Sequence, residues 1–167
     1  MKYKCEDMVV YGIHGVCRIT GIETRVVDRK SIAYYVLEPI KRSDAKFYVP
    51  TKNPAAVAKM RKMLTSRELD KLLKSSEVKV DSWIANETVR KEQYKMLIAR
   101  ADCAELISMI RTLYFHKQKQ LAAGKKFHQC DENFMRDAER VIRLEISCIL
   151  DIPQENVGEY IRKKLGE

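Results

Sequence analysis

The sequence of 167 residues contains no C-x-x-C pair, no glycine-rich phosphate-binding motif and no long hydrophobic run. Its five cysteines are odd in number and scattered, which argues against a disulfide framework and against a zinc ribbon. Neither G-x-G-x-x-G nor G-x-x-x-x-G-K-S/T occurs, which excludes the usual nucleotide-binding loops. No segment approaches the roughly 18 apolar residues of a membrane span, and the charged start "MKYKCEDMVVYG" is unlike a signal peptide. We therefore expect a cytoplasmic protein without membrane association.

The stretch "VVYGIHGVCRIT" places His14 three residues before Cys17 and raises the question of a nucleophile with its base. In an extended strand such residues point to opposite faces, and Cys17 shares its inward face with Ile19. A buried structural thiol is therefore favoured over an activated one, which needs a polar and partly exposed setting. His116 and His128 lie too far apart, without a carboxylate at ligand spacing, for a metal site. We expect no enzyme, no metal, no cofactor and no small-molecule ligand.

The charge of the chain is positive and unevenly distributed. The net charge is +9, which favours partners with phosphate backbones or acidic protein surfaces. Residues 1–64 carry 13 Lys and Arg against 6 Asp and Glu, whereas residues 65–167 carry 19 against 17. Charge alone therefore points to residues 1–64 as a nucleic-acid binder.

The first 64 residues predict a small, strongly bent β-sheet. Alternation of apolar and polar residues over 16–27 changes phase at Gly21, where a bulge would bend the strand. Two further strands are expected over 31–38 and 45–49, followed by a short helix around 55–63. A short, bent strand of this kind suits a small barrel.

From residue 65 the hydrophobic period changes to that of a helix. Thr65 with Glu68 forms a capping-box pattern before a leucine-rich segment, and Asp102 caps a second helix. The segment 131–150 begins amphipathic and ends apolar nearly all round, which predicts a central buried helix, and Pro153 opens a last short one. The fold class is therefore α+β, with a barrel over residues 1–64 and an all-α domain over residues 65–167.

The only tryptophan, Trp83, lies in "DSWIANETVRKEQYKMLI", in which residues 85–93 are almost wholly polar. This pattern predicts Trp83 at the tip of a solvated helical stretch, and packing of Trp83 against the core is the alternative. Basic residues follow it, on the same expected helix and in the stretch 111–126, which has no acidic residue; among them are Arg90, Lys91, Lys95, Lys117, Lys125 and Lys126. An aromatic side chain beside a basic patch is suited to stacking or wedging on nucleic acid, although each lysine taken singly is also compatible with an ordinary solvated face.

Several stretches, in their order and spacing, resemble the CarD/CdnL family of bacterial transcription regulators. They are "DMVVYGIHGVCRITGIE", "YVLEP", "KFYVPTKN", "MRKMLTSRELDKLL", "RKEQYKMLIARAD" and "GKKFHQCDENFMRDAERVI". The resemblance covers nearly the whole chain. It implies an N-terminal Tudor-like barrel that binds the RNA polymerase β subunit and a helical domain that contacts promoter DNA at the upstream edge of the bubble.

The resemblance also implies particular contact residues. Arg25 stands where family members carry a contact arginine, and Lys46 and Tyr48 point outward from the edge-like strand that ends at Pro50. These four residues are the expected polymerase-binding site. Trp83 with the six basic residues named above is the expected DNA-binding site.

Two alternatives remain open at this point. A stand-alone DNA- or RNA-binding protein would use the same basic residues without polymerase, and its affinity would survive physiological salt without a protein partner. An enzyme that uses Cys17 and His14 would require a lowered pKa of the Cys17 thiol.

Overall fold

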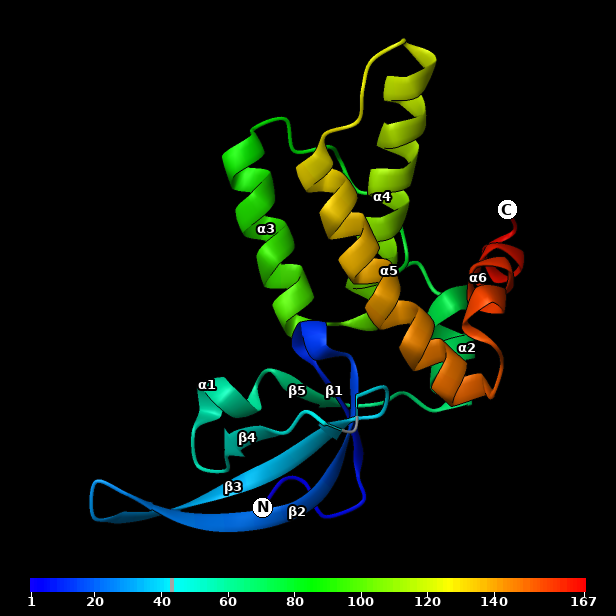
Figure 1. The fold of residues 1–167 in the computed structure, drawn as a ribbon. Coiled ribbons are helices and arrows are strands. Elements are labelled where there is room, and N and C mark those ends of the chain that lie inside the picture. Colours follow the sequence, from blue (N-terminus) through cyan, green and yellow to red (C-terminus); the bar gives the residue numbers. More distant parts are fainter. Residues whose placement is uncertain (43) are drawn as a thin grey trace.

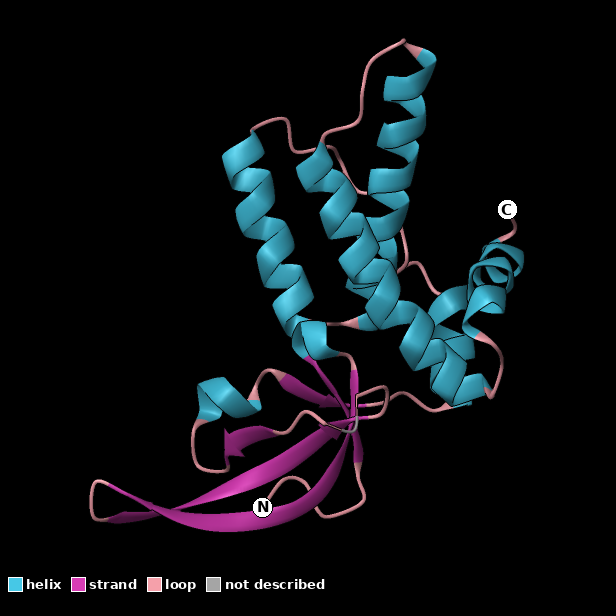
Figure 2. Cartoon of the chain, viewed as in Figure 1, coloured by secondary structure: helices cyan, strands magenta, loops and turns pink. Residues whose placement is uncertain are grey.

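The computed structural model describes residues 1–42 and 44–167, and it combines an N-terminal β-sheet with a C-terminal bundle of helices (Figures 1 and 2). The sheet lies at one end of the molecule. Helices α3, α4 and α5 rise from it roughly side by side, and the short helices α2 and α6 lie beside the lower part of α5 (Figure 1).

The sheet has five antiparallel strands in the order β4-β3-β2-β1-β5. Their bounds are β1 Met8–Tyr11, β2 Val16–Val27, β3 Lys30–Pro39, β4 Phe47–Pro50 and β5 Met60–Lys62. The register of β2 against β3 shifts between Ile19 and Gly21, which confirms the bulge predicted at this glycine. Asp28 and Arg29 both have positive φ, as a two-residue hairpin turn requires. Among the described residues β4 and β5 do not pair, so the α+β class is confirmed but closure into a barrel is not shown.

The prediction of a single helix around residues 55–63 is wrong. Helix α1 covers only Pro54–Val57 after its Asn53 cap, and strand β5 follows it. Strand β5 pairs with β1, and Met60 is buried in the core of the sheet. The Tyr3 hydroxyl also donates to the Met60 carbonyl at 3.0 Å. These long-range contacts outweigh the local helical pattern.

The helical region contains α2 Ser66–Lys74, α3 Glu87–Arg100, α4 Cys103–Ala122, α5 Gln129–Leu150 and α6 Val157–Leu165, with one-turn 3₁₀ helices at Gly12–His14 (η1) and Gln154–Asn156 (η2). The Thr65 side chain accepts from the Glu68 amide, and the Glu68 carboxylate accepts from the Thr65 amide, which confirms the capping box. Asp102 caps α4 as predicted. Of the described helices, none has a stretch of sufficient length and apolarity to cross a bilayer.

The sheet and the helices share part of their packing. One buried cluster lies within the sheet, whereas Val10 and Val16 of the sheet belong to the larger helical cluster. Gly12, with a φ of +48°, allows η1 to approach the end of α3, where an added Cβ would lie 3.4 Å from the Ala99 carbonyl oxygen. The two parts therefore pack directly against each other.

A buried ion pair also joins the sheet to the bundle. Arg61 of β5 makes two hydrogen bonds to Glu145 of α5, at 2.7 and 2.5 Å, and a third to the Ala101 carbonyl at 2.6 Å. Glu145 is fully buried. The sequence pattern indicates an almost entirely apolar surface for this part of α5, and Glu145 is the exception that binds the sheet.

Candidate functional site

The first candidate surface lies along β4, which is an edge strand of the sheet. The Tyr48 side chain is exposed, and the Arg25 guanidinium lies over its ring at 3.8 Å from the centroid. Arg25 belongs to β2, so its side chain reaches across β3 to meet Tyr48. Arg25 also binds Glu23 at 3.2 Å. The cation–π contact holds the guanidinium at the surface beside the edge strand.

The other two residues expected here lie near the same edge. Lys46 precedes β4 and its Nζ lies 3.2 Å from a Glu38 carboxylate oxygen, and Pro50 ends β4 opposite Tyr34. We name Arg25, Lys46, Tyr48 and Pro50 the β4-edge surface. An edge strand that ends at a proline and has a lysine directly before it is protected against uncontrolled strand pairing yet open to a specific partner.

The side chains of His14 and Cys17 lie in different surroundings. Cys17 is fully buried, and burial raises the pKa of its thiol to about 12, which opposes formation of the thiolate. His14 instead lies against the Phe47 ring, with centroids 4.1 Å apart. The interpretation of Cys17 as a buried thiol is confirmed. Over residues 1–42 and 44–167 no group of three potential metal ligands is found.

The second candidate surface is built around Trp83, which does not lie on a helix as predicted. It belongs to the connection between α2 and α3, residues 75–86, which we name the Trp83 segment. Helix α3 starts only at Glu87, where the Asn86 side chain accepts a hydrogen bond from the Val89 amide and caps the helix. Hydrogen bonds to α4 hold this connection in place. The Lys79 amide donates to the Ser108 hydroxyl at 3.0 Å, and the Asp81 amide donates to the Thr112 hydroxyl at 2.9 Å.

The Trp83 indole lies between two other side chains. Its ring stacks on the His116 imidazole with centroids 3.5 Å apart and planes 5° apart, and the Arg90 guanidinium lies 4.6 Å from the Trp83 ring centroid. Trp83 is partly buried and also packs against the helical core. The structure therefore combines features of the two alternatives, because the indole contacts the core and keeps part of its surface in solvent.

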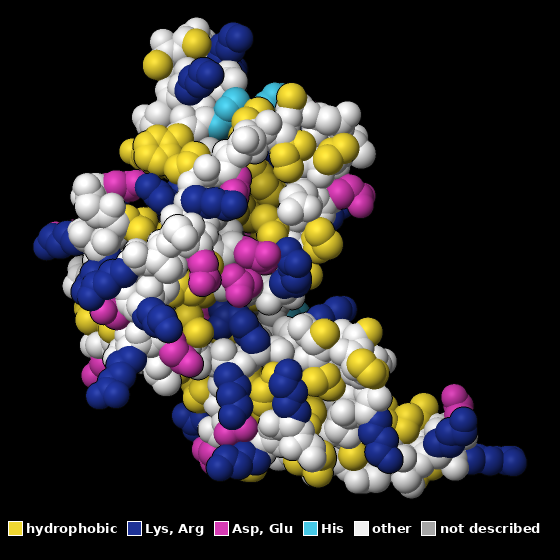
Figure 3. Space-filling model, turned by 180° about the vertical axis from the view of Figure 1, so that it is seen from behind, with side chains coloured by type: hydrophobic (Ala, Val, Ile, Leu, Met, Phe, Trp, Pro, Cys, Tyr) yellow, Lys and Arg dark blue, Asp and Glu magenta, His cyan; other side chains and the backbone are white. Residues whose placement is uncertain are grey.

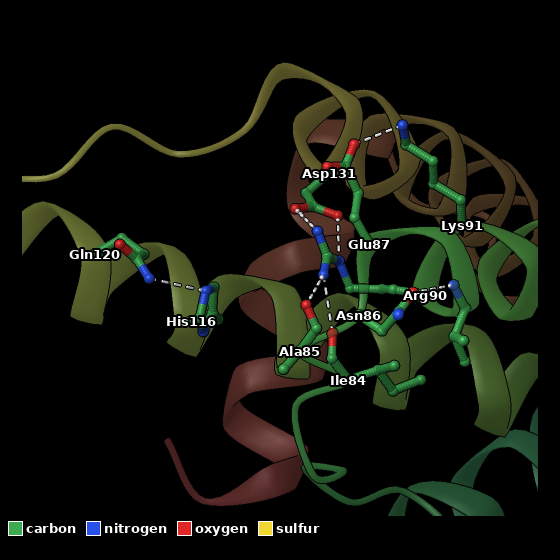
Figure 4. Close-up of polar contacts among 10 residues, drawn as sticks. Ile84, Ala85, Asn86, Glu87, Arg90, Lys91, His116, Gln120 and Asp131 are labelled. Atoms are coloured by element: carbon green, nitrogen blue, oxygen red, sulfur yellow. Dashed lines mark hydrogen bonds and ion pairs between the residues drawn. The ribbon is translucent and has the colours of Figure 1, made fainter.

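Arg90 is buried, and Figure 4 shows its polar contacts. Its Nε and Nη2 atoms bind both carboxylate oxygens of Asp131 on α5, at 2.8 and 2.9 Å, and its Nη1 atom donates to the Ile84 carbonyl at 2.9 Å. The bidentate pair raises the pKa of Arg90 further above its usual value. Arg90 thus connects α3, α5 and the Trp83 segment, whereas the sequence analysis expected it on the DNA-binding surface.

The predicted lysines differ in their surroundings. Lys91 pairs with Glu87 at 2.6 Å, as Figure 4 shows, and Lys117 pairs with Glu132 at 2.8 Å. Lys95, Lys125 and Lys126 are exposed, and within the described part of the chain they have no ion-pair partner within 4.0 Å. Lys125 and Lys126 follow Gly124 in the connection between α4 and α5.

The Trp83 segment and the α4–α5 connection lie at the end of the bundle farthest from the sheet (Figure 1). We name this end, with Trp83, His116, Lys125 and Lys126, the bundle tip. Figure 3 shows Lys and Arg side chains gathered at the tip directly above histidine. Burial and the neighbouring cations Arg90, Lys119 and His128 lower the pKa of His116, and Asp131 acts in the opposite direction. A neutral imidazole at pH 7 suits stacking beside cations.

The sequence analysis considered His116 only as a metal ligand and missed its contact with Trp83. A signal was present, because Ser108, Thr112 and His116 follow one another at four-residue spacing on α4 and so share one face of the helix. All three contact the Trp83 segment, two through hydroxyl groups and one through its ring. A polar stripe of this kind on a mostly buried helix indicates a docked loop.

A comparison with known protein families finds a match for the part of the chain that forms the sheet. Residues 3–64 match the family described as CarD-like/TRCF RID domain. The sheet is therefore an RNA polymerase-interacting domain, and the chain has a role related to transcription. The match confirms the resemblance to the CarD/CdnL regulators on residues 3–64. The match ends at residue 64, and the helices that carry Trp83 lie outside it.

Proposed function

We propose that this chain is a bacterial transcription regulator that binds the β subunit of RNA polymerase and stabilises the open promoter complex. In this proposal the β4-edge surface, on a Tudor-like domain, contacts the β subunit. The bundle tip contacts promoter DNA at the upstream edge of the bubble.

Charge and geometry support the polymerase contact. Residues 1–64 hold most of the excess positive charge of the chain, and a basic surface suits an acidic partner protein as well as it suits DNA. The family match assigns this part of the chain to polymerase binding. The cation–π pair of Arg25 and Tyr48 offers an ordered, half-exposed cation beside an edge strand, which is a suitable anchor for a protein interface.

The bundle tip supports the DNA contact. Trp83 is held by stacking and by the buried Arg90, so little conformational entropy is lost when its exposed edge meets a base step. Lys125 and Lys126 are free to contact phosphates next to it, and Lys95, Lys91 and Lys117 add positive charge. Arg90 acts in this scheme as a positioning residue.

Magnitudes favour stabilisation of a bubble over independent melting of DNA. Stacking of one aromatic side chain on a base contributes roughly 1 to 3 kcal/mol. Opening about a dozen base pairs at roughly 1.4 kcal/mol each costs far more. Trp83 would therefore shift the equilibrium of a bubble that polymerase has opened, by roughly 5- to 150-fold. The proposal includes no catalytic step, in keeping with the buried Cys17 thiol.

The observation that carries the proposal is the combination, in one chain, of a polymerase-interacting sheet with an ordered tryptophan at a basic tip. Its test is the affinity of the full chain for promoter DNA at physiological salt, with and without RNA polymerase. The proposal predicts tight binding only in the presence of polymerase. Equal affinity without polymerase would instead indicate a stand-alone nucleic-acid binder.

A further inference from the structure

An apolar groove lies between α4, α5 and α6 and has no part in the proposed polymerase or DNA contacts. Its volume is about 370 Å³, within the range of ligand-binding pockets. Aliphatic side chains form most of its lining, among them Ile107, Ile110, Ile142, Val157, Ile161 and Leu165. Two exposed aromatic residues, Tyr114 and Phe115, flank it. Such a lining binds an apolar group of modest size.

A single arginine, Arg111 of α4, carries the most informative polar atoms of this groove. Its Nη2 atom binds the Glu167 carboxylate. Its Nε atom is buried and has no acceptor among the residues that the structure describes. Nε and Nη2 form the side of the guanidinium that grips a carboxylate with two parallel hydrogen bonds. In Arg111, therefore, Nη2 already binds a carboxylate, whereas Nε is buried without an acceptor among the described residues.

Arg90 in the same protein shows the complete arrangement. Its Nε and Nη2 atoms bind the two oxygens of the Asp131 carboxylate at 2.8 and 2.9 Å. The comparison indicates what Arg111 lacks, which is a carboxylate placed to bridge both atoms. A buried N–H without an acceptor is costly, so a ligand that supplies this acceptor gains affinity.

We propose that the groove binds a small amphiphilic carboxylate, with its apolar chain between α4, α5 and α6 and its carboxylate on the Nε and Nη2 atoms of Arg111. Arg143 and Arg162 also line the groove and add positive charge, against Glu139 and Glu167. The Glu167 side chain competes for Arg111 and must leave when the ligand binds. The assignment rests on the groove itself and is independent of the proposed role in transcription.

Gly158 of α6 offers a variant that fills the groove without disturbing the fold. It lines the groove, and a Cβ built on it meets no atom within 4 Å. Replacement of glycine in a helix by a larger residue also favours the helix. Gly158→Leu should therefore block the groove in a folded protein. Arg111→Met removes the guanidinium and keeps an unbranched apolar side chain. Arg136→Met, at an exposed position of α5 outside the groove, is its matched control.

The test is calorimetric titration of the full chain with decanoate below its micellar concentration, and with 1-decanol as the uncharged counterpart. We expect saturable binding of one decanoate, at least tenfold weaker binding of decanol, and a loss of at least tenfold with Arg111→Met but not with Arg136→Met. Gly158→Leu should abolish binding, and Glu167→Gln should strengthen it.

The proposal is overturned if decanoate does not bind, if decanol binds equally well, or if neither Arg111→Met nor Gly158→Leu weakens binding. It is also overturned if the groove binds only an acidic amphipathic peptide, because the occupant would then be a protein. Thermal melts of each variant show that a loss of binding reflects the groove and not unfolding.

Discussion

At the scale of single residues, the contact between Trp83 and His116 makes the stability of the bundle tip depend on pH. Because burial and neighbouring cations lower the pKa of His116, the folded protein binds this proton less readily than the unfolded chain, whose histidine has a pKa of about 6.5. The contribution of His116 to stability is therefore complete above about pH 6.5 and is lost as the pH falls through the lower, folded-state pKa.

His116→Phe tests this effect, since phenylalanine keeps an aromatic ring against Trp83 but takes up no proton. The single tryptophan makes fluorescence a specific readout. We expect Trp83 emission of the wild-type protein to change as the pH falls from about 7.5 to 5, and the change to disappear in His116→Phe. A wild-type titration that is flat, or a variant that titrates identically, would contradict the prediction.

The buried pair of Arg90 and Asp131 gives a second prediction at this scale. Arg90→Met leaves a buried carboxylate without its cation, and we expect the free energy of unfolding to fall by roughly 3 to 5 kcal/mol. Lys91→Met is the matched control, since it breaks only a solvent-screened pair with Glu87, for which the loss should be small. Urea unfolding measures both losses, and similar values for the two variants would refute the role given to Arg90.

At the scale of elements, the parts that the sequence predicted correctly depend on local interactions. The capping box at Thr65, the Asp102 cap of α4 and the bulge at Gly21 each involve residues close together in the chain. Strand β5 and the start of α3 were mispredicted because distant partners decide them. Met60 is held by β1 and Tyr3, and the Trp83 segment is held by hydroxyl groups of α4.

The same distinction applies to the site. The exposed Tyr48 followed from strand alternation. The burial of Arg90 did not follow, because its partner Asp131 is 41 residues away in the sequence. Glu145 was missed for the same reason, since its partner Arg61 comes from the sheet.

The β4-edge surface provides the prediction at the element scale. Arg25→Glu should reverse the charge presented to an acidic partner and weaken binding of the RNA polymerase β subunit by several kcal/mol. The side chain is about half exposed, so the sheet should remain folded. Lys163→Glu makes the same charge change on α6, and it should bind β like the wild-type chain. Titration calorimetry with the β subunit measures both, and an unchanged affinity for Arg25→Glu would remove Arg25 from the interface.

At the scale of the whole molecule, the sheet and the bundle are joined by Arg61 and Glu145 and by shared packing of Val10 and Val16. This connection suits a protein that would hold polymerase at one end and DNA at the other, since a rigid joint fixes the position of the tip. We expect wild-type unfolding to follow one transition by both far-UV circular dichroism and Trp83 fluorescence.

Arg61→Met should lower the free energy of unfolding by roughly 3 to 5 kcal/mol and separate these two transitions, because Glu145 loses its partner and the joint is weakened. Coincident transitions with wild-type stability in this variant would show that the ion pair does not couple the two parts.

The lifetime of the open promoter complex with Trp83→Ala tests the central claim most directly. Trp83 also packs on the core, so Phe134→Ala is the control, since Phe134 is a partly buried aromatic residue of the same bundle that meets Tyr94 edge to face. Both variants are compared at a temperature where each is folded. We expect Trp83→Ala to shorten the lifetime by roughly 5- to 150-fold while polymerase binding persists, and Phe134→Ala to behave like the wild type. A wild-type lifetime with Trp83→Ala, or an equal loss with Phe134→Ala, would contradict the account.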